Sequence, residues 1–168
     1  MSDLRICLAD YANPAHAKAL VDVLDDYARD PMGGGEGLSA YARTHLVSSL
    51  AARPFMFSVL AFADGSAETP VGLVNCVEGF STFACKPLVN VHDFAVLTSH
   101  RRQGIGEKML AFVGQLAKER GACKLTLEVL QGNTSAKALY MRAGFADYQL
   151  DEAMGSAQFM QKYLEESP

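Results

Sequence analysis

The spacing of apolar residues predicts helices in the first third of the chain. After Asn13-Pro14, which is typical of a helix cap and first turn, apolar positions recur every three or four residues as far as Tyr27. A second helix is predicted over Leu38–Arg53, and the proline that follows ends it. The glycine-rich break at 31–37 follows a helix and lacks a phosphate-loop pattern, so it is interpreted as a loop near the mouth of a site.

The middle of the chain is rich in β-branched and aromatic residues. The segments Phe57–Ala63 and Val71–Glu78 are separated by a polar stretch at 64–70, which is typical of a hairpin. Val89–Leu97 is a third apolar strand of this region, and the N-terminal segment Leu4–Leu8 also reads as a short strand. A mixture of helices and strands around one sheet is therefore expected.

In the last third of the chain, segments with helical spacing of apolar residues alternate with strand-like segments. A long amphipathic helix runs from Ile105 and stops at Gly121, because a glycine favours the turn that ends a helix. The remaining predicted elements are a strand, a short helix and two closing strands: Leu125–Leu130, Ser135–Ala143, Phe145–Leu150 and Gln158–Leu164. The fold class is α/β (α+β mixed), with a central twisted mixed β-sheet flanked by helices in a single domain over residues 1–168.

Composition and charge narrow the class of partner. The chain has 168 residues and a formal net charge of −4, which disfavours nucleic acid as a partner and suits a cationic substrate. Its four cysteines form no CxxC pair and no zinc-type spacing with histidine, so no metal is expected and the thiols are taken as reduced. No apolar run approaches a membrane span and no signal-peptide core is present, so we expect no membrane partner and a cytoplasmic location.

The strongest local signal is the segment 91–106, in which an apolar strand runs into a basic, glycine-containing loop and then a helix. The first N–H groups of a helix lack internal partners and carry the positive end of the helix dipole, which favours an anion there. Gly104 and Gly106 let the backbone approach a phosphate, and Arg101 and Arg102 add donors. Met109 excludes the dinucleotide fingerprint. Taken alone, the segment could also be a tight turn with two solvated arginines.

A second signal lies in the segment 127–145. Asn133 follows a strand, and the residues after it begin a short helix. Asn133, Ala136 and Tyr140 are three and four residues apart, so they share one helical face. The alternative for Tyr140 is a core tyrosine whose hydroxyl is satisfied.

The two segments together resemble the signature of the GNAT acetyltransferases. Arg101-x-x-Gly104-x-Gly106 is similar to their (Q/R)-x-x-G-x-(G/A) motif, and the run from Asn133 to Phe145 resembles their second acetyl-CoA segment. The resemblance implies an acyltransferase that uses acetyl-CoA as co-substrate. It implies a bulged strand that splays from its neighbour, with the cofactor between them. The cofactor-binding residues implied are Phe94, Ala95, Val96, Arg101, Arg102, Gln103, Gly104, Ile105, Gly106, Asn133, Ala136 and Tyr140.

Catalytic roles are implied for three residues. Tyr140 is expected to direct its hydroxyl at the cofactor sulfur as an acid. Glu128 stands where acetyltransferases of a ribosomal protein's N-terminal amine carry a base, and His92 stands two residues before the implied bulge, where polyamine acetyltransferases carry a glutamate. Glu128 could instead be a paired acid of the sheet and His92 a strand histidine, or the proton could leave through water. Asp93 is placed on the opposite strand face and is given no role.

The acceptor is expected to bind between the first two helices and the strand ends. Tyr27, Asp26, Glu78 and Phe80 are the candidate substrate residues, because acids attract a cation and aromatic faces bind one. A small primary amine or amino-acid-like acceptor is favoured. A protein N-terminus or lysine is the alternative acceptor, and a non-catalytic acetyl-CoA or CoA-binding sensor module is the alternative function. A homodimer is possible.

Overall fold

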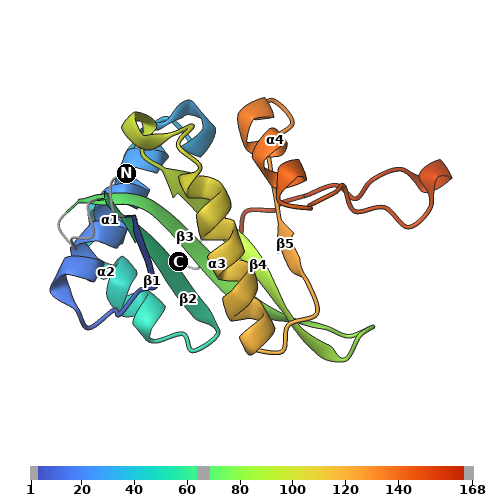
Figure 1. Ribbon diagram of the computed structural model, residues 1–168, viewed down its shortest axis with the longest axis horizontal. Coiled ribbons are helices and arrows are strands. Elements are labelled where there is room, and N and C mark those ends of the chain that lie inside the picture. Colours follow the sequence, from blue (N-terminus) through green and yellow to red (C-terminus); the bar gives the residue numbers. More distant parts are fainter. Residues whose placement is uncertain (1–3, 64–68, 165–168) are drawn as a thin grey trace.

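The computed structural model describes residues 4–63 and 69–164, and within them the strands form a sheet in the order β1-β2-β3-β4-β5 (Figure 1). The first four strands form an antiparallel meander, and β5 pairs with β4 in parallel. A parallel pair of strands needs a crossover connection, and the helix α3 (Ile105–Glu119) supplies it between β4 and β5. The strands are β1 (Arg5–Leu8), β2 (Met56–Phe62), β3 (Pro70–Ser81), β4 (Lys86–Val96) and β5 (Leu125–Leu127).

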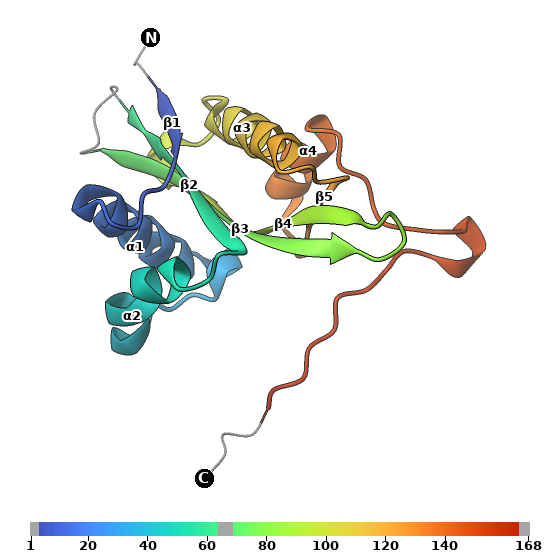
Figure 2. The same ribbon diagram turned by 90° about the horizontal axis from the view of Figure 1, so that it is seen from below.

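The four α-helices of the described residues cover the two faces of the sheet (Figure 2). One face carries α1 (Pro14–Arg29) and α2 (Ala40–Ala51), joined through the short helix η1 (Pro31–Gly33), and the other carries α3 (Ile105–Glu119) and α4 (Thr134–Arg142). The short helices η3 (Thr98–His100) and η4 (Glu152–Met154) lie in the connections. Two buried clusters follow from this layering, one under α1 and α2 and one under α3 and α4. The predicted fold class is therefore confirmed.

The helices begin within two residues of the predicted starts, and the local reasons are visible. Asn13 caps α1, because its side chain accepts hydrogen bonds from the N–H groups of Ala15 and His16. Ser39 caps α2 by accepting from the N–H of Ala42. By contrast, α3 begins at Gly104 without a side-chain cap, which leaves its first turn open for another acceptor.

A bulge in β4 changes which side chains face α1 and α2. Asn75 of β3 pairs with Asp93, whereas Cys76 pairs with Val91, so His92 is the extra residue of β4. The resemblance implied a bulge two residues after His92, and the structure corrects this position. Because alternation is interrupted at the bulge, His92 and Asp93 line the same pocket rather than opposite faces, which corrects the earlier placement of Asp93.

The bulge also separates β4 from β5. The two strands pair only at Val89–Leu125, Asn90–Thr126 and Val91–Leu127. Beyond Val91, β4 continues to Val96 with no strand beside it on that side among the described residues. This exposed strand edge has free backbone groups that an extended ligand can meet.

The C-terminal part of the chain differs from the sequence prediction. The expected strand Leu125–Leu130 ends at Leu127, and neither Phe145–Leu150 nor Gln158–Leu164 is a strand. The segment bridges only to itself, at Gln149 and Ser156, and runs away from the body of the molecule (Figure 1). A strand needs a neighbouring strand to satisfy its backbone, and none of this segment pairs with β5. The predicted hairpin loop at 64–70 lies largely outside the described residues.

Candidate active site

The N-terminus of α3 has the geometry of an anion site. Arg102 and Gly104 adopt left-handed backbone conformations, with φ of 62° and 77°, and this turns the loop so that the helix begins at Gly104. Among the described residues, nothing accepts a hydrogen bond from the N–H groups of Arg102, Gln103 or Gly104. A Cβ added at Gly104 would meet no atom within 4 Å, so the space in front of the turn is open. Successive free N–H groups at a helix start can bind a phosphate.

The side chains of this loop serve mainly to hold it. Arg101 donates through Nε to the carbonyl oxygen of Val96 at 2.9 Å and forms an ion pair with Asp30 at 3.0 Å. Gln103 donates to the carbonyl oxygen of Ser99. The guanidinium that the sequence placed beside the phosphate therefore joins the loop to η1, whereas Arg102 is exposed and available to an anion.

Two residues of the motif fix α3 against its neighbours. Ile105 is buried in the core under α3. A Cβ at Gly106 would lie 2.9 Å from Leu139 of α4 and 3.2 Å from Phe94 of β4. Gly106 thus allows close contact between α3, α4 and β4, which is a packing role in addition to the predicted approach to phosphate.

Tyr140 lies at the point where α4, β4 and the segment after α4 meet. It is 8% exposed, and its ring contacts those of Phe94 and Phe145 edge-on, with centroids 5.9 Å apart in each pair. Burial, and secondarily the nearby phenol of Tyr27, raise the pKa of Tyr140 to about 12. The phenol therefore keeps its proton throughout the neutral range and can donate it.

Asn133 caps α4, because its side-chain oxygen accepts from the N–H of Ala136 at 3.1 Å. Its amide nitrogen has no partner among the described residues and is therefore a free donor at the start of α4. Ala136 packs partly buried against the core under α3 and α4. Phe94, Ala95 and Val96 supply the strand edge that β5 leaves unpaired.

The two predicted bases lie in different settings. Glu128 is exposed just after β5, and both its carboxylate oxygens accept from the side-chain amide of Asn90, at 3.2 and 3.3 Å. His92 is exposed at the bulge and lines a cavity of about 270 Å³ together with Asp93. Asp93 was given no role from sequence, but it is the carboxylate that the structure places in this cavity.

The predicted acceptor residues are only partly brought together. Tyr27 is half-buried, and its hydroxyl donates to the carbonyl oxygen of Met32. Burial, then the charges of Asp93 and Asp30, raise the pKa of this phenol. Asp26 is exposed on α1. Glu78 instead pairs with Arg120 at 3.5 Å on the α3 face, which removes it from the acceptor side.

Other candidate groups are also placed elsewhere. Phe80 is 59% exposed on the hairpin between β3 and β4, outside the cavity. Asp25, which could have attracted a cation, is held by Arg43, Arg29 and the N–H of Leu38, and its pKa falls to about 2 chiefly because of Arg43. Within residues 4–63 and 69–164, no three histidine, cysteine or acidic side chains cluster as metal ligands would. None of the helices described there is long and apolar enough to cross a membrane.

The sheet splayed beyond a bulge, the uncapped helix start and the buried tyrosine form the arrangement expected of a protein that holds an extended, anionic cofactor between two strands. The chain belongs to the acetyltransferase (GNAT) family, whose sequence model matches residues 20–145. This confirms the resemblance and, at the level of the family, the expectation of an acetyl-transferring enzyme that uses acetyl-CoA.

Relatives in sequence are acetyltransferases. An uncharacterized N-acetyltransferase of Archaeoglobus fulgidus is 32% identical over 126 residues, which cover 71% of this chain and 84% of that protein. A streptothricin acetyltransferase of Streptomyces lavendulae is 35% identical over 95 residues, which cover 55% of this chain and 50% of that protein. The match therefore spans about half the length of the streptothricin enzyme.

Solved structures share the fold. A probable acetyltransferase superposes with a TM-score of 0.79 at 22% identity, over 96% of this chain and 99% of the other. An aminoglycoside acetyltransferase from an uncultured soil metagenomic sample, in complex with trehalose, superposes with a TM-score of 0.71 at 20% identity, over 95% of this chain and 97% of the other. At these identities the likeness concerns the fold alone.

Proposed function

We propose that this protein is an N-acetyltransferase that moves the acetyl group of acetyl-CoA to the primary amine of a small acceptor. The observation that carries the proposal is the combination of an uncapped α3 start with free N–H groups and a buried, protonated Tyr140 beside the unpaired edge of β4. A protein that only binds CoA has no need of a proton donor at that place.

Acetyl-CoA supplies a thioester, whose acyl carbon the acceptor nitrogen attacks: the C–N bond forms and the C–S bond breaks. The N–H groups of residues 102–106, with Arg102, would hold the pyrophosphate, and Asn133 would donate to the pantetheine arm. The edge of β4 at Phe94–Val96 orients the arm along the strand. Positioning of this kind is worth up to roughly 7–11 kcal/mol in bimolecular reactions.

Proton transfer is assigned to Tyr140 as the donor and to His92 or Glu128 as the acceptor. Tyr140 keeps a proton at its hydroxyl and donates to the departing sulfur. The acceptor ammonium must lose a proton before attack, and His92 or Glu128 accepts it, directly or through water. Both are exposed, so either can pass the proton to solvent.

A cationic small molecule is the favoured acceptor class. The relatives named for streptothricin and for aminoglycosides support this, because both names refer to small-molecule acceptors. The alternative is acetylation of a protein N-terminus or lysine, which draws on the position of Glu128. A structural relative is named a ribosomal-protein-alanine N-acetyltransferase. A cytoplasmic location is proposed because all four cysteines are free thiols, as a reducing compartment maintains them.

Binding of acetyl-CoA should be visible in thermal unfolding. Ligand at about 100 times its Kd adds about 2.7 kcal/mol to the free energy of unfolding, which raises Tm by roughly 5–10 °C for a domain of this size. CoA should act similarly, and ATP and NAD serve as controls. Release of thiol should then be measured with a panel of small amines and peptides. Absence of a Tm shift at millimolar acetyl-CoA would contradict the cofactor site, and binding without any thiol release would favour the sensor function.

We also propose a homodimer formed through the C-terminal segment 148–164. This segment is extended and exposes large apolar side chains, among them Leu150 (87%), Phe159 (74%) and Tyr163 (85%). Next to β5, a groove of about 800 Å³ between α3 and α4 is lined by Leu110, Leu125 and other residues. A second copy is the occupant that the geometry favours, because it offers the same unpaired segment and each segment leads away from its own groove (Figure 1).

Light scattering after size exclusion should give twice the chain mass of 18.1 kDa. The double variant Phe159→Asp/Tyr163→Asp should give a single chain at the same concentration, because it places charges in the apolar contact. Phe83→Asp is the matched control, since this fully exposed aromatic lies at the tip of the β3–β4 hairpin. A monomeric parent chain, or a double variant that stays dimeric, would refute the proposal.

A further inference from the structure

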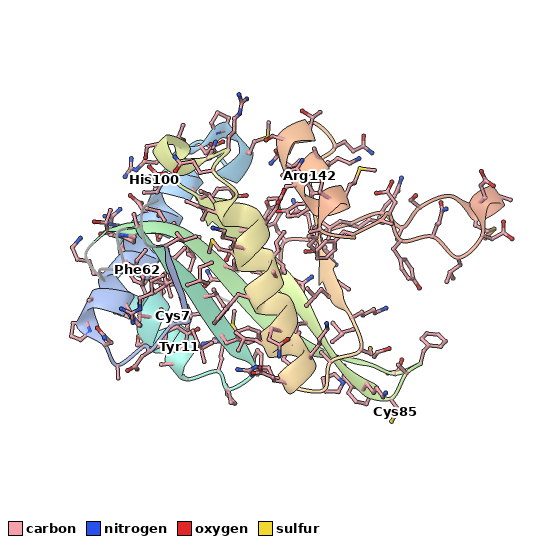
Figure 3. All side chains as sticks on the ribbon, viewed as in Figure 1. Cys7, Tyr11, Phe62, Cys85, His100 and Arg142 are labelled. Carbon is pink, nitrogen blue, oxygen red and sulfur yellow. The ribbon has the colours of Figure 1, made fainter. Side chains whose placement is uncertain are left out.

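A chain of hydrogen bonds runs from Tyr11 across the strands β2 and β3 to Asp93 of β4, which lines the cavity. Tyr11 Oη lies 2.9 Å from Ser58 Oγ, Ser58 Oγ lies 2.6 Å from Asn75 Oδ1, and Asn75 Nδ2 lies 3.0 Å from Asp93 Oδ2. Ser58 and Asn75 are 1% and 2% exposed, so these polar groups depend on one another. Tyr11 lies in the loop after β1, well away from the loop that carries His100 (Figure 3).

The direction of these bonds is fixed by the carboxylate at the end. An ionised carboxylate only accepts, so Asn75 must present its NH₂ group to Asp93. Its oxygen then accepts the single hydroxyl hydrogen of Ser58, and the Ser58 oxygen must accept from the hydroxyl of Tyr11. All three bonds point toward Asp93 and polarise one another, which stabilises negative charge there and holds the carboxylate in one orientation. Because an amide cannot readily pass a proton on, the chain is a support for charge rather than a proton path.

The cavity around Asp93 suits a cation with an apolar portion. Leu46, Leu50 and Met56 line its walls, and Asn75 and His92 lie beside the carboxylate. The other charged group that lines it is Arg53, which donates to the carbonyl oxygen of Ser49 at its own end of α2. Outside the cavity, the charge of Asp93 also raises the pKa of Tyr27, itself the neighbour of Tyr140.

We propose that Asp93 binds an ammonium group of the acceptor other than the one acetylated, and that Asn75, Ser58 and Tyr11 are positioning residues that orient it. A carboxylate would keep the bound amine protonated and unreactive, so the bound nitrogen is an anchor and a second amine is the nucleophile. The site therefore selects acceptors with two or more amino groups. This inference rests on the proposed function, and it names the acceptor class.

The test uses binding, so that it does not depend on turnover. The full chain is titrated with 1,5-diaminopentane and, separately, with 1-aminopentane, and amide shifts of residues 92–94 are followed by NMR. The diamine should bind at least tenfold more tightly than the monoamine once CoA, which carries no acetyl group to transfer, is present, and Asp93→Asn should remove that preference. Equal binding of the two amines, no shift with either, or an unchanged preference in Asp93→Asn would each refute the anchor. Failure of acetyl-CoA binding would appear independently in the thermal measurement.

The positioning role is tested by Tyr11→Phe, which removes one hydroxyl and keeps the ring. Diamine affinity should fall about three- to tenfold, whereas Tyr41→Phe should change nothing, because Tyr41 is 73% exposed and stacks on His45 of the same helix. In the Asp93→Asn background, Tyr11→Phe should have no further effect, because it acts through Asp93. An additive loss in the double variant would mean that Tyr11 acts on the fold rather than on the carboxylate, and would overturn its assigned role.

Discussion

Replacing Tyr140 with phenylalanine is expected to lower kcat by about 100-fold or more while acetyl-CoA affinity stays within about twofold of the parent value. The ring would keep its contacts with Phe94 and Phe145, so the site should retain its shape. Only the hydroxyl is lost, and with it the proton donor to the departing sulfur. Single-turnover thiol release and calorimetric titration of acetyl-CoA measure the two quantities separately.

The raised pKa of Tyr140 bears on this result. A phenol at about 12 would be a poor acid for a solvated thiolate, whose pKa is near 8.5. Burial acts on sulfur in the same direction, as the buried thiol of Cys76 shows, with its pKa raised to about 12 mainly by desolvation. If the departing thiolate is buried to the same degree, the pKa of its thiol is raised as well and comes close to the pKa of the Tyr140 phenol. Because its pKa is about 12, the Tyr140 phenol keeps its proton between pH 8 and 10. A loss of activity in that pH range would therefore come from another group and should also be seen in Tyr140→Phe.

A kcat within about threefold of the parent value would remove Tyr140 from the acid role. Tyr41→Phe is the control, since Tyr41 is 73% exposed on α2 and stacks on His45 of the same helix. Its kinetic constants should not change.

Replacing Gly104 with valine is expected to weaken acetyl-CoA binding at least tenfold, that is by at least 1.4 kcal/mol. The residue lies at φ 77°, which a β-branched side chain adopts only with strain, and its Cβ would enter the open space before the α3 start. Relief of that strain would also turn the free N–H groups away from the pyrophosphate. Calorimetry with CoA and acetyl-CoA checks the affinity.

Gly121→Val is a matched control at the other end of the same helix. Gly121 has φ 75° and, like Gly104, no atom within 4 Å of an added Cβ. Both variants should therefore lose similar stability, about 1–2 kcal/mol by denaturant titration, but only Gly104→Val should lose affinity. If the two variants bind acetyl-CoA equally well, the helix start is a turn without a ligand.

The helices and central strands could be predicted because their signals are local. Asn13, Ser39 and the two glycines at the ends of α3 each act on the adjacent backbone, so residue order alone reveals them. The two segments proposed to bind the cofactor have local signals for the same reason, since each is a short strand–loop–helix unit. The predicted closing strands did not form, because a strand exists only with a partner strand, and among the described residues 145–164 pairs only with itself.

Long-range pairing explains the site residues that the sequence misjudged. Asp93 seemed to face away from His92 because strict alternation was assumed, and only the pairing of β3 with β4 reveals the extra residue. Arg101 and Glu78 seemed free, but Asp30 and Arg120, both distant in sequence, pair with them. A polar residue in an apolar strand, as with Ser58 and Asn75, was the available signal for the buried network.

The sequence by itself determined the family, the layered fold and the loop that is proposed to meet the cofactor, because these depend on periodicity and on glycines with fixed backbone needs. Only the tertiary structure decided which acidic side chains are available to the proposed acceptor, and to which side of the sheet the β4 bulge directs them. Charge pairing and strand register are relations between distant residues, and their energies depend on distances that the chain order does not contain.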